Sequence, residues 1–233
     1  MPRLGVGQEA ASTLGDTAVL VLRFGHDTAA VDRVAWASAP AMRLTMTGHA
    51  VAARVMGVDY RVTMDAEGLV TTYAFELSPP GRAVADSVTF APPPPGTPAG
   101  VSSRGRTPLW NATPGLYDVL LRSARARLAM ASTPGSSVAI PLFRFGAAST
   151  RDTAAVSFVG RDSARVVLHT DGAPAIELLA QVDGAGRLLH AFVPTEGWTI
   201  ERVTSLPASA YVLAPAYGAP AGAPYVVESV EIH

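Results

Sequence analysis

The sequence predicts a mainly β protein: an antiparallel, strongly curved sheet or barrel of about ten strands from two pseudo-repeats, with one intervening α-helix. Three observations lead to this fold class. Short motifs recur in the same order, apolar residues alternate with a period of two, as from Tyr60 to Met64, and the connections are too short for parallel crossovers.

The internal repeat is the strongest of these observations. Arg23-Phe24-Gly25 followed by Asp27 to Val31 (DTAAV) returns as Arg144-Phe145-Gly146 followed by Asp152 to Val156 (DTAAV). Each copy then has an aspartate-to-glycine turn, at 65–68 and at 183–186. Each turn leads into an apolar strand that ends in a matched pair, Ala74-Phe75 and Ala191-Phe192.

The elements follow one another in a simple order. We expect a flexible arm at 1–15, a single β domain at 16–205, and a Pro/Gly linker with a terminal strand at 206–233. Within the domain, repeat A covers 17–90, a proline-rich linker 91–112, the helix 113–132 and repeat B 138–205. After a first strand from Thr17, candidate strands lie near 28–37, 41–48, 51–64, 69–77, 84–90, 138–145, 153–159, 163–170, 174–182, 187–193 and 197–204.

The helix has recognisable start signals. Thr113 is suited to the N-cap, and Pro114 to the first helical position, where its missing N–H is harmless. Arg122, Arg125 and Arg127 place positive charge toward the C-terminal half, which complements the helix dipole. An anion site on these arginines is one interpretation, and a solvated helix face is the one we favour.

Composition excludes several classes of function. A net charge of −1 gives no basic field for nucleic acid, and the absence of cysteine excludes disulfides and thiolate chemistry. All 18 positive side chains are arginines, which we interpret as codon bias from a GC-rich bacterial genome. No apolar run is long enough to span a bilayer. We expect an exported protein, periplasmic or extracellular, whose signal is missing from this sequence, and a cytoplasmic location is the alternative.

Catalytic signatures are missing from the sequence. Without lysine there is no phosphate-binding loop of the Gly-Lys-Ser type and no Schiff base, and no Gly-x-Ser-x-Gly elbow or His-Glu-x-x-His motif occurs. We therefore expect no cofactor, nominate no catalytic residue and no metal ligand, and lean toward a chain that is not an enzyme by itself.

One ligand site can be nominated from the repeat. His190 aligns with Tyr73, two positions before the matched phenylalanines Phe75 and Phe192. If that face lines the barrel interior, Tyr73, Phe75, His190 and Phe192 form an amphipathic wall suited to a small apolar ligand. Ordinary core packing is the other explanation of the same pattern.

The C-terminal region resembles a known junction. The run from Ala219 to Tyr225 (APAGAPY), followed by Glu228 to Ile232 (ESVEI), is similar to the junction in secreted bacterial α/β-hydrolases of the serine-aminopeptidase-like group. In that group a β-rich N-terminal region precedes the serine hydrolase domain. The resemblance implies an accessory region and a C-terminal hydrolase domain as partner, and it carries over no catalytic residue.

The leading hypothesis from the sequence is a non-catalytic β domain that binds a small apolar ligand, a substrate or a partner domain, as an accessory to an exported hydrolase. One alternative is a stand-alone, esterase-like hydrolase whose catalytic residues converge only in the fold. A second alternative is a purely structural module. The ligand and the oligomeric state cannot be read from the sequence.

Overall fold

The structure, a computed structural model, describes residues 13–39, 43–52, 56–78, 84–89, 106–109, 113–130, 137–144 and 151–203. The predictions for residues 1–12, for most of the 91–112 linker and for the 206–233 segment lie outside these residues. Phe145 and Gly146, which belong to the second copy of the Arg-Phe-Gly motif, also lie outside these residues.

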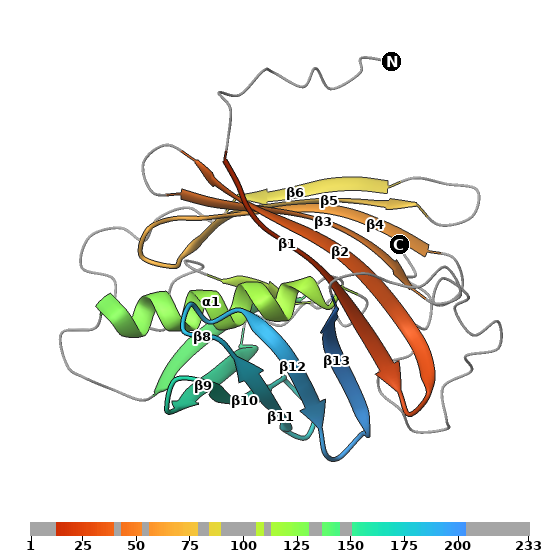
Figure 1. The fold of residues 1–233 in the computed structure, drawn as a ribbon, viewed down its shortest axis with the longest axis vertical. Helices are drawn as coiled ribbons and strands as arrows, with labels where there is room; N and C mark the ends of the chain where they lie inside the picture. Colours follow the sequence, from red (N-terminus) through yellow and green to blue (C-terminus); the bar gives the residue numbers. More distant parts are fainter. Residues whose placement is uncertain are drawn as a thin grey trace.

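The described chain forms a sheet of thirteen strands and one helix (Figure 1). The first group of strands is β1 (Thr13–Phe24), β2 (Asp27–Ala39), β3 (Arg43–Ala52), β4 (Met56–Met64), β5 (Val70–Ser78) and β6 (Val84–Thr89). The short β7 (Thr107–Leu109) and helix α1 (Gly115–Met130) follow. The second group is β8 (Ser137–Arg144), β9 (Thr153–Val159), β10 (Ser163–His169), β11 (Ile176–Val182), β12 (Leu188–Val193) and β13 (Trp198–Val203).

The predicted fold class is confirmed in its main features, and its details need correction. The protein is mainly β, its sheet is curved and almost wholly antiparallel, and one helix separates two strand meanders. The strand count is thirteen and not about ten: the twelve candidate strands correspond to β1–β6 and β8–β13, and β7 is the thirteenth. Strand β1 begins at Thr13, inside the predicted arm, and β7 lies inside the predicted linker. Strand β7 pairs with β8 in parallel, which is possible because the connection between them contains helix α1 and is long enough for a crossover.

The strand order reveals how the two meanders join. It runs β6-β5-β4-β3-β2-β1-β13-β12-β11-β10-β9-β8-β7, so that the first strand of one meander pairs with the last strand of the other. A closed, two-fold pseudo-symmetric barrel would repeat this contact by pairing β6 with β8. Among the described strands that second pairing is missing, because β7 occupies the free edge of β8.

The sheet rolls inward at this unclosed position. All the side chains of β7 are buried, as expected of a strand that is covered on both faces. Helix α1 packs against β7 and β8, and Phe143 of β8 contacts Tyr73, a core residue of β5, with ring centroids 6.3 Å apart. We call this place, where β8 meets β5 through side chains and without backbone pairing, the seam.

Helix α1 lies between the two meanders, with β3–β6 above it and β8–β11 below it in Figure 1. Its first seven residues, from Gly115 to Leu121, are all buried, so the helix fills much of the space that the curved sheet surrounds. Prediction placed the helix at 113–132 with Thr113 as N-cap. In the structure the helix begins at Gly115, and the backbone N–H of Gly115 is bound by the carboxylate of Asp32 from β2.

The two aspartate-to-glycine turns have the same geometry. Asp65 accepts hydrogen bonds from the backbone N–H groups of Glu67 and Leu69. Asp183 does the same with those of Ala185 and Arg187. Each turn ends in a glycine with a φ of 79°, which a residue with a β-carbon rarely adopts, and each glycine packs directly on α1.

Candidate functional site

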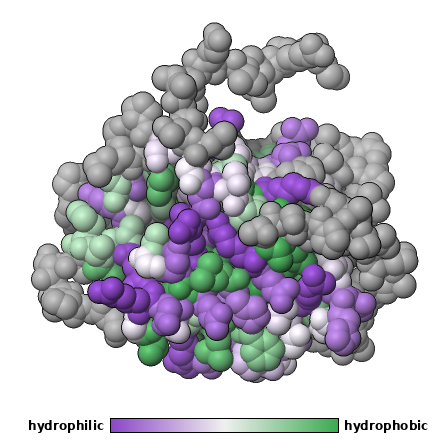
Figure 2. Space-filling view, viewed as in Figure 1, coloured by the Kyte–Doolittle hydropathy of each residue, from purple (hydrophilic) through white to green (hydrophobic). Residues whose placement is uncertain are grey.

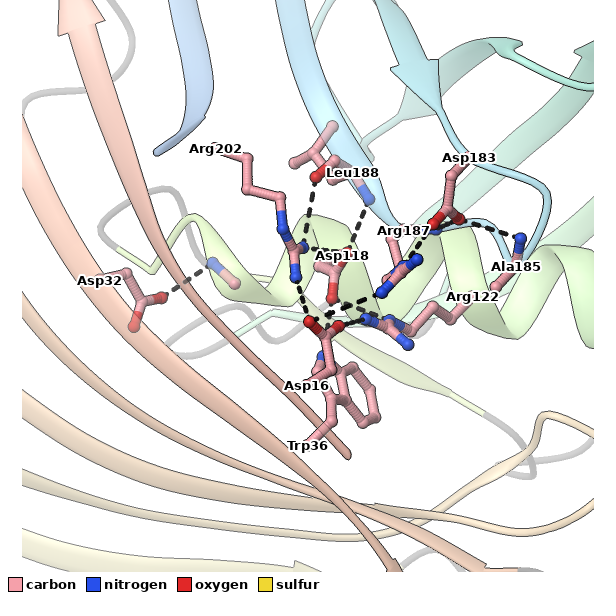
Figure 3. A network of polar contacts seen from close by, with 11 residues as sticks. Asp16, Asp32, Trp36, Asp118, Arg122, Asp183, Ala185, Arg187, Leu188 and Arg202 are labelled. Atoms are coloured by element: carbon pink, nitrogen blue, oxygen red, sulfur yellow. Dashed lines mark hydrogen bonds and ion pairs between the residues drawn. The ribbon is translucent and has the colours of Figure 1, made fainter. Parts of the chain in front are cut away.

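Asp118 of α1 is the centre of a buried polar network (Figure 3). Its side chain is fully buried, and it accepts hydrogen bonds from Trp36 Nε1 at 2.7 Å, Arg122 Nε at 2.9 Å and the backbone N–H of Leu188 at 2.7 Å. These donors belong to β2, to α1 and to the start of β12. One carboxylate therefore ties the helix to both meanders.

Asp16 of β1 extends the network toward the junction of the two meanders. Its carboxylate contacts Arg122 Nη2 at 2.5 Å and Arg202 Nη2 at 2.7 Å, with Arg187 Nη1 at 3.7 Å. The Arg122 guanidinium also lies over the ring of Trp36, 4.4 Å from its centroid. The network thus spans β1, β2, α1, β12 and β13 and joins the strands on both sides of the β1–β13 contact.

The charges of this network balance. Asp16, Asp118 and Asp183 face Arg122, Arg187 and Arg202, and each carboxylate has an arginine within ion-pair distance. Buried charges that are paired and hydrogen-bonded in this way are stable, and they become costly when one partner is removed. We therefore assign this network a structural role, which is to hold α1 in the curved sheet.

The helix arginines correct an expectation from the sequence. They were expected on a solvated face, but the side chain of Arg122 is only 10% exposed. Arg125 lies over the ring of Phe158 at 3.9 Å, and burial lowers the pKa of Arg127, an effect that the charge of Asp65 partly offsets. The reason is that long arginine stems cover apolar surface while their charged ends reach distant carboxylates, which helical periodicity does not reveal.

A second buried cluster lies at the N-terminus of α1. Asp32 is fully buried on β2, and its Oδ2 accepts hydrogen bonds from the Tyr60 hydroxyl at 2.5 Å and from the Gly115 N–H at 2.8 Å. A carboxylate at this end of a helix is stabilised by the helix dipole. Two glycines make room for Tyr60: a β-carbon added at Gly48 or at Gly115 would lie 2.2 Å from an atom of its side chain.

Aromatic rings connect this carboxylate to the seam. Tyr60 and Tyr73 meet edge to face at 6.5 Å, and Tyr73 contacts Phe75 at 5.4 Å and Phe143 at 6.3 Å. We call Asp32, Tyr60, Tyr73, Phe75 and Phe143 the seam cluster. It combines four aromatic rings from β4, β5 and β8 with one buried carboxylate from β2.

The two tyrosine hydroxyls of the seam cluster differ. Burial, followed by the charge of Asp32, raises the pKa of both Tyr60 and Tyr73 well above the usual value of 10.0, so both stay protonated at neutral pH. The Tyr60 hydroxyl donates to Asp32. The Tyr73 hydroxyl makes no hydrogen bond within the described residues, and it is not among their fully buried unpaired polar atoms, so it lies at the edge of the core.

The structure separates the four residues of the predicted ligand wall. Tyr73 and Phe75 lie in the core, 2% and 5% exposed, as part of the seam cluster. His190 and Phe192 lie on the outer face of the second meander, where Phe192 is 37% exposed and pairs across strands with Leu179 and Thr199. The four residues therefore do not form one wall, and only Tyr73 and Phe75 line the interior.

A shift of one residue explains the separation. The turns at Asp65 and Asp183 match with an offset of 118 positions (183 − 65), whereas the two phenylalanines match with an offset of 117 (192 − 75). Each meander has a β-bulge after its turn, at Thr71 and at Leu189, and these two residues are also 118 positions apart (189 − 71). Residues that are 118 positions apart are therefore the structurally equivalent ones. Tyr73 is then equivalent to Ala191, and a one-residue shift moves His190 and Phe192 to the other face.

Sequence reasoning missed Asp16, Asp32 and Asp118, although two of them left a signal. Asp16 lies an even number of residues from the buried Ala18, Leu20 and Leu22, so it is expected on the same face of its strand. Asp32 stands in the same relation to the buried Ala30, Val34 and Trp36. An aspartate on the apolar side of a strand is a candidate buried carboxylate, because burial without a partner is costly.

The outer face carries less contiguous apolar surface than the interior. Leu179, Leu189 and Val159 are exposed there, but Figure 2 shows hydrophilic side chains (purple) interspersed with apolar ones (green) over the lower part of the view. In the described segments, no group of three or more His, Asp or Glu side chains is arranged to hold a metal ion. The described helix is also too short and too polar to cross a membrane.

Comparisons with known proteins give structural likeness only. No protein-family model matches the sequence, and no curated protein matches it. A β-barrel-like protein of the domain of unknown function DUF1849 from Brucella abortus is similar over 80% of this chain and 92% of its own, with 10% identity and a TM-score of 0.43. A DUF1089 family protein from Pseudomonas aeruginosa is similar over 81% and 95%, with 14% identity and a TM-score of 0.39. At these TM-scores the likeness carries no argument about function.

Proposed function

We propose that this chain is a non-catalytic β domain that binds a small apolar ligand at the seam cluster. The observation that carries the proposal is the unclosed seam: β13 pairs with β1, but the equivalent pairing of β6 with β8 is missing among the described strands. At this place the two meanders meet through the rings of Tyr73 and Phe143. Side-chain contacts separate more easily than a hydrogen-bonded ladder, so a ligand can enter between them at lower cost.

The chemistry of the cluster supports the same proposal. Sites for small molecules are lined mainly by apolar and aromatic side chains, with a few polar groups that fix the ligand's orientation. Phe75 and Phe143 supply apolar rings, and the Tyr73 hydroxyl is a polar group at the edge of the core. His190 and Phe192 take no part in this site.

Fluorescence of the neutral probe N-phenyl-1-naphthylamine tests the proposal, because the probe emits strongly only in an apolar environment. Titration of the full chain should give saturable binding. Phe75→Leu should weaken it about threefold to tenfold, through the loss of a buried ring contact. The matched outer-face change Phe192→Leu should leave it unaltered. An affinity that falls with Phe192→Leu and not with Phe75→Leu would rule out the seam as the site.

An ester assay separates this proposal from the stand-alone hydrolase predicted as an alternative. A binding domain should not turn over p-nitrophenyl butyrate above the rate in buffer. Turnover by the purified chain, abolished by replacing one serine or histidine, would support the hydrolase and contradict a non-catalytic domain. The accessory role beside an exported hydrolase stays a prediction from the resemblance at 219–232.

A further inference from the structure

We propose that the segment that follows β13, residues 204–233, packs on the outer face of β1 and β2 and covers an apolar pair there. The pair consists of Val21 of β1 and Val31 of β2, which are partners across the two strands. They are only 0% and 2% exposed, so both are removed from solvent. This face is separate from the seam cluster, and the contact is an addition to the ligand site proposed there.

The two valines lie on the face of the sheet that points away from the core. Their chain neighbours Leu20, Leu22 and Ala30 belong to the apolar core, and side chains alternate between the two faces along a strand. Val21 and Val31 are accordingly not members of that core cluster, although they are as deeply buried as its members. Their burial therefore has another cause than packing in the interior.

Burial of this pair requires a second layer of chain on the outer face. Glu201, the partner of Val21 across the β1–β13 pairing, has a side chain that is 44% exposed. On the outer face of the second meander, Phe192 and Val159 are 37% and 67% exposed. Helix α1 is not the cover, because it is hydrogen-bonded to Asp32, which lies on the opposite face of β2. The cover is therefore a segment other than α1.

The segment 204–233 starts closest to the valine pair. It follows Val203, which pairs with Val19 of β1, two residues from Val21. Two residues of a strand span about 7 Å, so a few residues beyond Val203 are enough to reach the pair. The N-terminal residues enter β1 at Thr13, eight residues from Val21 and about 27 Å away along the strand.

The composition of the segment suits this face. The apolar run Tyr211-Val212-Leu213 begins eight residues after Val203, and its burial against the valine pair is favourable. The segment contains two glutamates and no arginine or lysine. Arg23 and Arg33 flank the pair on the outer face, so the charges of the two surfaces are complementary. We infer that the run at 211–213 anchors the segment.

Thiol labelling of the full chain with iodoacetamide, a neutral reagent, tests the proposal. The sequence contains no cysteine, so one introduced residue is the only thiol. The thiol of Val21→Cys should react at least about a hundredfold more slowly than that of Val159→Cys, because only the second position is open to solvent. Replacement of all three residues at 211–213 by serine should raise the rate of Val21→Cys at least about tenfold.

Two controls accompany this measurement. Serines at Val226, Val227 and Val230, in the same segment but outside the anchoring run, should leave the rate of Val21→Cys unchanged. The thiol of Val166→Cys, a core position that is 0% exposed, should stay protected in both serine variants and so report that they are folded. If the triple change at 211–213 exposes that core thiol, the single change Val212→Ser takes its place and should raise the rate of Val21→Cys in the same direction.

Each contrary result overturns the proposal. Equal rates for Val21→Cys and Val159→Cys would show that the outer face of β1 and β2 is open. A slow rate that serines at 211–213 leave unchanged would show that another part of the chain covers the pair. A rate that rises only with the serines at 226, 227 and 230 would place the anchor elsewhere in the segment and contradict the assignment to 211–213.

Discussion

Gly68 and Gly186 contact different faces of α1 within the same stretch of helix. A β-carbon at Gly68 would lie 2.6 Å from Ala126 Cβ and 2.8 Å from the Ser123 carbonyl oxygen. One at Gly186 would lie 2.9 Å from Arg125 Cβ and 3.1 Å from the Leu121 carbonyl oxygen. The two repeated turns thus hold the helix between the meanders, and Ser123 Oγ donates a hydrogen bond to the Gly68 carbonyl at 2.5 Å.

Substitution of these glycines should destabilise the protein strongly. Gly68→Ala and Gly186→Ala should each lower the free energy of unfolding by about 2 to 4 kcal/mol, from positive-φ strain together with overpacking against the helix. Gly172→Ala is the matched control, because its φ is 75° and no atom lies within 4 Å of an added β-carbon. It should cost only about 1 kcal/mol in urea unfolding. Equal losses for all three variants would contradict the account of the turns as helix supports.

The two tyrosines of the seam cluster should respond differently to loss of their hydroxyls. Tyr60→Phe removes a donor from the buried Asp32 carboxylate and should lower the free energy of unfolding by about 1 to 3 kcal/mol. Tyr73→Phe removes a hydroxyl with no partner in the described residues and should leave stability unchanged or slightly higher. A destabilisation by Tyr73→Phe as large as that of Tyr60→Phe would show that the Tyr73 hydroxyl is bonded in the free protein.

The network around Asp118 should be sensitive to the loss of one charge. Asp118→Asn leaves Arg122 and Arg202 short of a carboxylate and should lower the free energy of unfolding by about 3 to 5 kcal/mol. Glu177→Gln, in the solvent-facing pair with Arg165, is the comparison and should have little measurable effect. Thermal unfolding of both variants measures the difference. A harmless Asp118→Asn would mean that the network does not hold the helix.

Acid should weaken the second turn through Asp183. Partial burial raises the pKa of this carboxyl, but hydrogen bonds from the Arg187 and Ala185 backbone and from the Arg187 guanidinium outweigh it and hold the pKa below the usual 3.8. A lowered folded-state pKa gives stability that is fully present above the unfolded value of 3.8 and is lost as the pH falls through the lower folded value. Asp183→Asn should therefore lower the free energy of unfolding at neutral pH. The difference from the wild type should shrink as the pH falls through the lowered pKa of Asp183. A deficit that is constant with pH would contradict this assignment.

The β elements were predictable because their signals are local. Period-two alternation and the Asp-to-Gly turns depend on neighbouring residues, so most strands and both turns could be placed from the sequence. The strand β7 could not, because Thr107-Pro108-Leu109 has no alternation and is ordered by burial between α1 and the rest of the fold. The helix bounds were close, at 113–132 against Gly115–Met130.

The candidate site was only half predictable for a related reason. Tyr73 and Phe75 lie in the interior, whereas a bulge at Leu189 turns His190 and Phe192 to the outer face, and a bulge has no clear local signature there. The partners of Asp32, Tyr60 and Gly115, lie 28 and 83 positions away from it. The partners of Asp118, Trp36 and Leu188, lie 82 and 70 positions away. Such long-range pairs depend on how the sheet curves, which no short pattern encodes.

The central claim, that ligand binds at the seam cluster, is tested most directly by nuclear magnetic resonance of the full chain with isotope-labelled tyrosine and phenylalanine rings. Saturation with dodecanol should shift the ring signals of Tyr73 and Phe75. Those of Tyr117 in α1 and of Phe192 on the outer face should stay in place. Shifts at Phe192 without shifts at Tyr73 and Phe75 would contradict the account.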